Sequence, residues 1–146
     1  MPRLAAGDSG EQKSAEKLLI HRLARQLRVK LTKRRFPIQG GGWLEVDGAC
    51  ESPPIVCEAW AHIGPPKSAQ KHKVLADAFK LLYASRMTGK PIRMILLFGD
   101  REAARHFKGR SWMAQALRDS GIEVHVVDLS AKKRDMLRMA QQRQYR

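Results

Sequence analysis

Two β-type stretches separated by a short turn constrain this chain most. Residues 43–50 and 55–63 are rich in apolar and β-branched residues, and the Pro-Pro segment 51–54 between them is typical of a turn. This spacing predicts an antiparallel hairpin. A helical pattern begins near Lys67 and an apolar stretch follows at 92–98, so we expect the hairpin to join a larger α/β sheet.

The order of patterns along the whole chain predicts a three-layer α/β sandwich with a mixed central sheet. Strand–helix–strand units in the second half imply parallel pairing, whereas the hairpin adds antiparallel strands. The remaining expected elements are a helix over about 10–30, a short edge strand at 36–38, helices at 100–109 and 111–120, and a strand at 122–129. We expect a disordered tail at 1–8, one domain over 9–130, and a basic helix within 131–146.

Asp47 and Glu58 are the candidate site residues of the hairpin. Side chains alternate between the two faces of a strand, so Asp47 shares a face with Glu45, and Glu58 shares one with Trp60. If the more apolar faces turn to the core, Asp47 and Glu58 converge on the opposite, open face. Mg²⁺ is usually held by one or two carboxylates together with waters and substrate phosphate. The pair is therefore a candidate site for Mg²⁺, or Mn²⁺, acting on a phosphodiester.

Net charge points to the class of partner. The chain carries 28 Lys and Arg against 14 Asp and Glu, a formal net charge of +14. A surplus of this size is the electrostatic signature of a nucleic-acid binder. No acidic residue occurs from His21 to Arg35, so this segment is the expected phosphate contact. The residues predicted to hold nucleic acid are Arg22, Arg25, Arg28, Lys33, Arg34, Arg35, Lys67 and Lys71.

At about residues 11–99 the chain resembles the restriction-endonuclease-like, or PD-(D/E)XK, nuclease superfamily. That family has a helix, a mixed sheet that begins with a hairpin, a second helix and a further strand. Asp47 resembles the family's Asp at the end of one strand, and Glu58 resembles the Glu of Glu-x-Lys on the next. Glu16 resembles the acidic residue that many members carry on the first helix. The resemblance implies metal-dependent cleavage of DNA.

One position departs from that motif, because Trp60 stands where the family has its lysine. In some members the lysine lies on the following helix, and here Gln70 and Lys73 lie one turn apart on it. We therefore expect Lys73 to point toward Glu58 with Gln70 beside it. Lys67, at the start of the helix, is the second candidate.

The function expected from the sequence is a metal-dependent deoxyribonuclease. A catalytically silent nucleic-acid-binding module on the same fold is the alternative, and a binder of anionic membranes or acidic proteins is a weaker third. The first residues lack the apolar core of a secretory signal, and the densest apolar run, 94–98, is too short to cross a bilayer. We expect a cytoplasmic protein without a membrane partner; a protein partner or a homodimer stays open.

Overall fold

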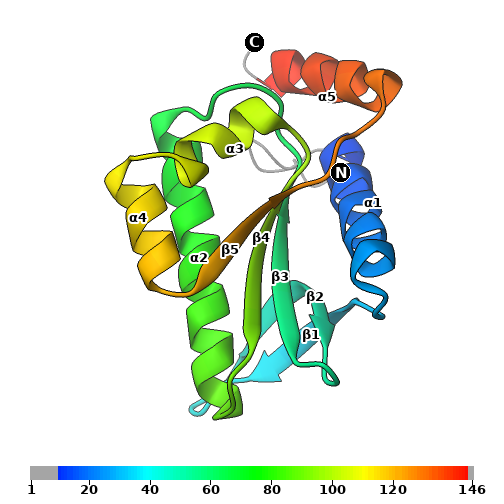
Figure 1. The fold of residues 1–146 in the computed structure, drawn as a ribbon. Helices are drawn as coiled ribbons and strands as arrows, with labels where there is room; N and C mark the ends of the chain where they lie inside the picture. Colours follow the sequence, from blue (N-terminus) through cyan, green and yellow to red (C-terminus); the bar gives the residue numbers. More distant parts are fainter. Residues whose placement is uncertain (1–9, 145–146) are drawn as a thin grey trace.

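The computed structural model describes residues 10–144, so the predicted tail at 1–8 lies outside the described residues. The chain forms an α/β fold around one five-stranded sheet, whose strands lie in the order β1-β2-β3-β4-β5 (Figure 1). The elements are α1 (Gly10–Leu27), β1 (Thr32–Pro37), β2 (Trp43–Cys50), β3 (Ile55–Trp60), α2 (Ser68–Thr88), β4 (Arg93–Phe98), α3 (Arg101–Lys108), α4 (Trp112–Asp119), β5 (Ile122–Val126) and α5 (Ala131–Gln144).

The sheet is mixed, as the sequence predicted. Strands β1, β2 and β3 pair antiparallel, whereas β3 with β4 and β4 with β5 pair parallel. Each parallel step is bridged by helix: α2 connects β3 to β4, and α3 with α4 connects β4 to β5. The hairpin and the crossover units therefore meet at β3, the central strand.

Helices cover both faces of the sheet and give three layers. In Figure 1, α2, α3 and α4 lie on one face, α1 lies on the other, and α5 crosses the end of the sheet above α1. One core cluster packs Leu19 and Leu23 of α1 against Cys57 and Ile95 of the sheet. The second packs α2, α3 and α4 against the opposite face, with Phe98 at its centre. Each layer is therefore held by burial of apolar area.

The sequence of α2 explains both its packing on the sheet and the point at which it ends. Val74, Ala78 and Leu81 recur at helical spacing and are buried against the sheet. Gly89 ends the helix in the left-handed conformation, with φ of 65°, which an L side chain rarely adopts. No helix in the described residues, α2 included, is long and apolar enough to span a membrane.

Two expectations about the hairpin need correction. The edge strand begins at Thr32 rather than near Phe36, because the basic segment pairs with β2 before Pro37 ends the ladder. Strand β3 has no open face, since all of its residues are buried between α1 and α2. Glu58 is therefore enclosed, with only 4% of its surface exposed, and does not lie on the open face that we expected.

Candidate carboxylate site and basic groove

A β-bulge in β2 positions Asp47. Thr32 of β1 pairs with Ala49 and Arg34 pairs with Val46, so β2 contributes one more residue than β1 over this interval. Val46 and Ala49 both pack into the core on the α2 side. The extra residue falls at 47–48, where strict alternation of faces breaks. Asp47 keeps the side of Glu45 and stands at the start of the bulge, directly before Gly48.

Asp47 and Glu58 meet where β2 and β3 separate. The ladder between these strands runs from Cys50 to Gly48, and Asp47 follows directly. Oδ2 of Asp47 accepts a 2.9 Å hydrogen bond from the backbone N–H of Ala59, and the Asp47 carboxyl lies close enough to that of Glu58 to raise its pKa. Two carboxyl groups in such contact share a proton or a cation. Asp47 and Glu58 thus lie close together, although Glu58 does not lie on the open face that we expected.

The charged partner of Glu58 is Lys80 of α2. The Lys80 ammonium lies 2.6 Å from Oε1 of Glu58. Burial, followed by the hydrogen bond and charge of Asp47, raises the pKa of Glu58 to about 10, although Lys80 opposes the rise. Burial disfavours the charge of Lys80, but Glu58, Asp77 and Asp47 together outweigh it and raise the pKa of this lysine.

Two neighbouring groups have pKa values shifted in the same direction as that of Glu58. Burial is the largest cause in raising the pKa of Asp77, one turn before Lys80, and the charge of Asp47 adds to it. Burial also raises the pKa of the Cys57 thiol to about 12, with contributions from Asp47 and Glu58. The surroundings of Asp47 and Glu58 therefore favour a proton or a cation, within a protein whose net charge is strongly positive.

We expected Lys73 to point toward Glu58, but the lysine that contacts Glu58 is Lys80, seven residues later on the same helix. Lys73 is exposed, and its charge acts on Asp77. Glu58 lies about six residues before the turn at Gly64, a distance of ~20 Å along a strand. A helix rises only ~1.5 Å per residue, so its thirteenth residue, and not its sixth, reaches that level. Lys80 is at that position.

Gln70 and Lys67, which we expected near the carboxylates, interact with each other at the start of α2. Oε1 of Gln70 accepts a 2.8 Å hydrogen bond from the backbone N–H of Lys67, which caps the helix. Nε2 of Gln70 lies 3.4 Å from Nδ1 of His62, and Nε2 of the buried Gln12 lies 3.1 Å from the same atom. The structure therefore places Gln70 in a polar cluster that joins α1, α2 and the end of β3.

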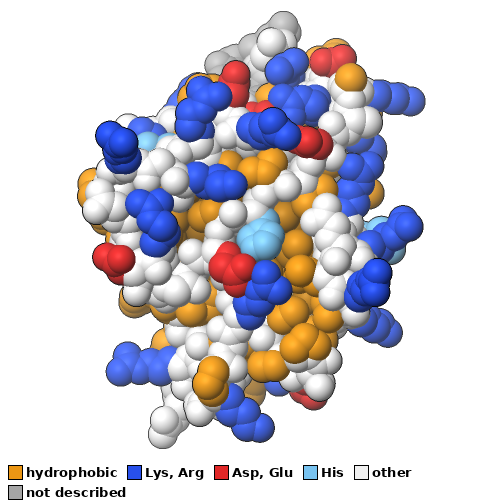
Figure 2. Space-filling view, in the orientation of Figure 1, with side chains coloured by type: hydrophobic (Ala, Val, Ile, Leu, Met, Phe, Trp, Pro, Cys, Tyr) orange, Lys and Arg blue, Asp and Glu red, His pale blue; other side chains and the backbone are white. Residues whose placement is uncertain are grey.

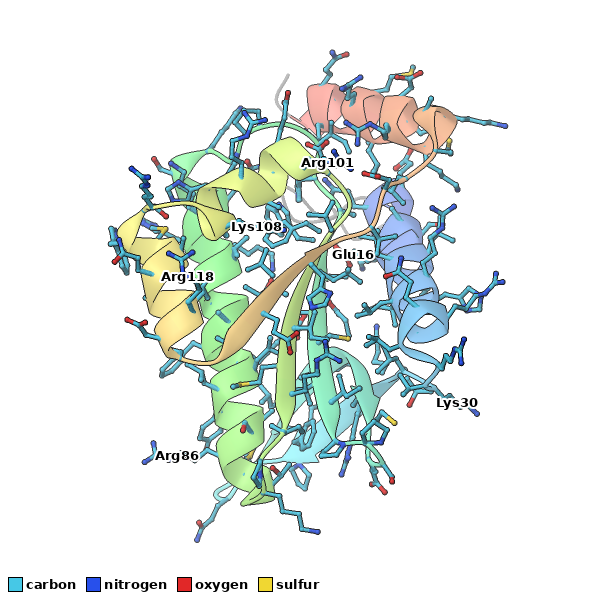
Figure 3. The ribbon with its side chains drawn as sticks, viewed as in Figure 1. Glu16, Lys30, Arg86, Arg101, Lys108 and Arg118 are labelled. Carbon is cyan, nitrogen blue, oxygen red and sulfur yellow. The ribbon has the colours of Figure 1, made fainter. Side chains whose placement is uncertain are left out.

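A groove of about 980 Å³ opens between α1 and the β1–β2 ribbon. Asp47 lines this basic groove with Glu16 and Glu45, whereas Glu58 lies on the α2 side of the sheet. Figure 3 shows Glu16 on the sheet-facing side of α1 and Lys30 beyond the end of that helix. Figure 2 shows Lys and Arg side chains projecting along the α1 side of the molecule. The cations that line the groove are Lys13, Lys17, Arg25, Arg28, Lys30 and Lys33.

The structure brings part of the predicted nucleic-acid set together at the groove. Arg35 lies beside it, with Nε 3.7 Å from Oε1 of Glu45. Arg22 turns the other way along α1 and donates a 2.6 Å hydrogen bond to the backbone oxygen of Asp128. The predicted residues that line the groove itself are Arg25, Arg28 and Lys33.

Arg34 and Lys71 lie elsewhere. Arg34 stacks over the ring of Phe36 at 4.6 Å and lies 3.3 Å from Glu51, on the opposite face of the ribbon. The charge of Lys71 helps to lower the pKa of His106 on α3, although burial is the larger cause. These two cations therefore belong to the α2 side of the sheet.

The donor set around Asp47 fits a hard divalent cation. Among residues 10–144, no group of three or more His, Cys, Asp and Glu side chains is arranged to hold a metal ion. Asp47 and Glu58 nevertheless supply carboxylate oxygens in contact, the ligand type that Mg²⁺ takes together with waters and phosphate oxygens. The pair therefore fits a site that the substrate completes.

The chain matches no known protein-family model, and comparisons with curated proteins and with solved structures gave no significant match.

Proposed function

We propose that the protein is a metal-dependent nuclease that hydrolyses phosphodiester bonds in DNA. The observation that carries the proposal is the proximity of Asp47, at the wall of a basic groove, to Glu58, buried on the neighbouring antiparallel strand. Nucleic acid is the polyanion that such a groove fits, and a carboxylate at its wall serves no purpose in holding phosphate alone. The two features together favour cleavage over simple binding.

Each residue of the site has a role in this proposal. Asp47 and Glu58 would hold Mg²⁺ or Mn²⁺, which supplies a Lewis acid for the scissile phosphate and lowers the pKa of a bound water. Lys80 stabilises the charge of Glu58 from within α2. The groove cations hold the phosphates on either side and offset the repulsion between substrate and carboxylates. Hydrolysis adds the water oxygen to phosphorus and breaks the bond to the leaving oxygen.

The order of elements supports a restriction-endonuclease-like core. Helix α1, the antiparallel strands β1 to β3, helix α2 and the parallel strand β4 follow the plan of that family in sequence and in pairing. In this arrangement Lys80 takes the place of the lysine that Trp60 displaces from the strand. The site therefore retains two acids and one base on the three elements that the family uses.

The test is a metal-dependent cleavage assay on duplex, single-stranded and nicked DNA, with Mg²⁺ or Mn²⁺ and with EDTA as the negative control. We expect Asp47→Ala and Glu58→Gln each to abolish cleavage. Glu45→Gln is the matched control, because Glu45 lines the same groove but pairs with Arg35. Cleavage that survives both substitutions would contradict the proposed site.

One observation favours a second candidate, a silent nucleic-acid-binding module. Glu58 is almost fully buried, and the ammonium of Lys80 already lies 2.6 Å from its Oε1. In that case Mn²⁺ titration by calorimetry gives no binding dependent on Asp47, and DNA binds without being cut. Metal binding that Asp47→Ala removes would instead support the nuclease.

A further inference from the structure

We propose that Trp43 is a stacking platform for an unpaired base, and that the site takes single-stranded nucleic acid along the β1–β2 ribbon. This inference names the substrate class of the proposed nuclease and rests on that function. It draws on the exposure of Trp43, on the cation beside its ring, and on the continuity of its surface with the basic groove.

Trp43 is displayed rather than packed. It begins β2 opposite Pro37, directly after a turn built from the three glycines 40–42, all with positive φ. Its side chain is 61% exposed, whereas Leu44, the next residue, packs against the core. Burying an indole ring releases a large apolar area from water, so an exposed one is a ready contact surface.

Arg35 places a positive charge beside the ring of Trp43. Its guanidinium lies 4.7 Å from the centroid of Trp43 and so covers part of the indole, while Glu45 orients the same guanidinium from 3.7 Å. The exposed remainder of the ring can take a base, and Arg35 can take the adjoining phosphate. Aromatic stacking next to cations is the common mode of single-strand binding, because every base has a π-face.

The ribbon leads from Trp43 to the carboxylates. Trp43 and Glu45 share one side with Arg35 and Lys33 of β1, and Glu45, Lys33 and Asp47 line the basic groove. Trp43 precedes Asp47 by about four residues, or ~13 Å along a strand. At ~3.4 Å per stacked nucleotide, a strand held at Trp43 presents a phosphate to Asp47 about four nucleotides away.

A duplex substrate does not account for the exposed ring of Trp43 as well as a single strand does. Base faces in a duplex are covered by their neighbours, so the duplex would use the groove cations and leave the ring unused. A protein partner bound at Trp43 would have no reason to approach Arg35 and the groove together. The juxtaposition of ring, cations and carboxylates on one surface favours an unpaired strand.

The test is fluorescence anisotropy in EDTA, with a labelled 12-nucleotide DNA strand and the duplex of the same sequence. We expect Trp43→Ala to weaken single-strand binding by about 5- to 150-fold, the value of one base–aromatic stack, with little change for the duplex. Trp43→Phe should retain most of the affinity. Trp112→Ala is the matched control, because Trp112 is 67% exposed on α4 and lies away from the groove; it should bind like the wild type.

The outcomes separate the inference from the proposed function. Equal effects of Trp43→Ala and Trp112→Ala, or equal losses for single strand and duplex, would overturn the role of Trp43. Cleavage that depends on Asp47 with undiminished single-strand affinity in Trp43→Ala would overturn this inference alone. Binding that depends on Trp43 with no cleavage under any metal would support the inference and leave the silent module as the function. Thermal melting of each variant identifies any loss that is due to unfolding.

Discussion

Lys80 and Glu58 join helix α2 to the central strand β3 through an ion pair of 2.6 Å at a depth where Glu58 is only 4% exposed. Burial disfavours the charged form of each residue, and the contact between them offsets part of that cost. The pair also fixes the height of α2 along the sheet, because Lys80 reaches Glu58 from one turn only.

Removal of Lys80 tests this contact. We expect Lys80→Ala to lower the free energy of unfolding at pH 8 by about 1–3 kcal/mol, because the variant removes the polar group that contacts the buried Oε1 of Glu58. Lys73→Ala is the control on the same helix, exposed and a heptad earlier, and should change stability by less than about 0.5 kcal/mol. Urea unfolding at matched pH measures both. In the cleavage assay the ranking should be the same, and equal activities of the two variants would refute the role given to Lys80.

The pH dependence of stability should report Glu58. Its pKa is about 10 in the folded protein against 4.5 in the unfolded chain, so the unfolded state loses this proton first. The contribution of Glu58 is therefore complete below pH 4.5 and declines as the pH rises toward 10. The raised pKa of Lys80 does not oppose this slope, since its contribution is lost only above 10.5.

Glu58→Gln should flatten the profile, because the amide mimics the protonated acid at every pH. We expect the variant to gain stability over the wild type as the pH rises from 5 to 9, measured by urea unfolding at several pH values. Glu45→Gln should retain the wild-type slope. A wild-type profile that rises through this window would contradict the protonated state assigned to Glu58.

Salt dependence should identify the groove as the phosphate contact. The logarithm of the DNA association constant should fall linearly with the logarithm of salt concentration, through counterion release. Lys17 and Arg25 line the groove. Lys17→Ala and Arg25→Ala should each reduce the magnitude of the slope by about one. Arg86→Ala, at the far end of α2 in Figure 3, should leave the slope unchanged. Equal effects of all three would place the contact elsewhere or spread it over the surface.

Asp100 should be the most sensitive carboxylate for stability outside the candidate site. It is buried at the N-terminus of α3 and accepts hydrogen bonds from Gly64 N–H at 2.7 Å, Ala103 N–H at 3.2 Å and Arg134 at 2.6 Å. Burial opposes its charge, but these donors prevail and lower its pKa. Its contribution is therefore present above the ordinary range of aspartate and is lost as the pH falls.

We expect Asp100→Ala to cost about 2–4 kcal/mol at pH 7, since it removes a helix cap and leaves Arg134 and two buried N–H groups unpaired. Asp119→Ala, an exposed carboxylate at the end of α4, is the control and should cost less than about 0.5 kcal/mol. Chemical unfolding followed by circular dichroism measures both. A small effect at Asp100 would show that α5 is not anchored through this pair.

The fold could be predicted largely because its signals are local. Hydrophobic periodicity and the turn residues gave the strands around Asp47 and Glu58 and the helices that flank them, close to their observed bounds. The parallel pairing of β3 with β4 follows from the helix between them. The burial of Glu58 could not be read locally, because it depends on α1 and α2 packing on both faces of β3 at once.

The site was harder to predict because two features depend on registration between elements. The bulge at Asp47 is visible only in the pairing of β1 with β2, since neither sequence alone specifies the extra residue. Lys73 and Lys80 are a heptad apart and share a helical direction, so periodicity cannot choose between them. The different rises per residue of strand and helix could have selected Lys80.

The bulge also divides the sheet into parts that should open separately. From Trp43 to Val46, β2 pairs with β1, whereas its ladder with β3 begins only at Gly48. The outer ribbon can therefore lose its amide hydrogen bonds while β3, β4 and β5 keep theirs, the behaviour of an independent cooperative unit in native-state hydrogen exchange. Protons on the arm that carries Trp43 should exchange with solvent well before those beside Glu58. The β1–β2 ribbon that carries Trp43 can thus adjust to a bound strand, while the strands around Glu58 stay rigid.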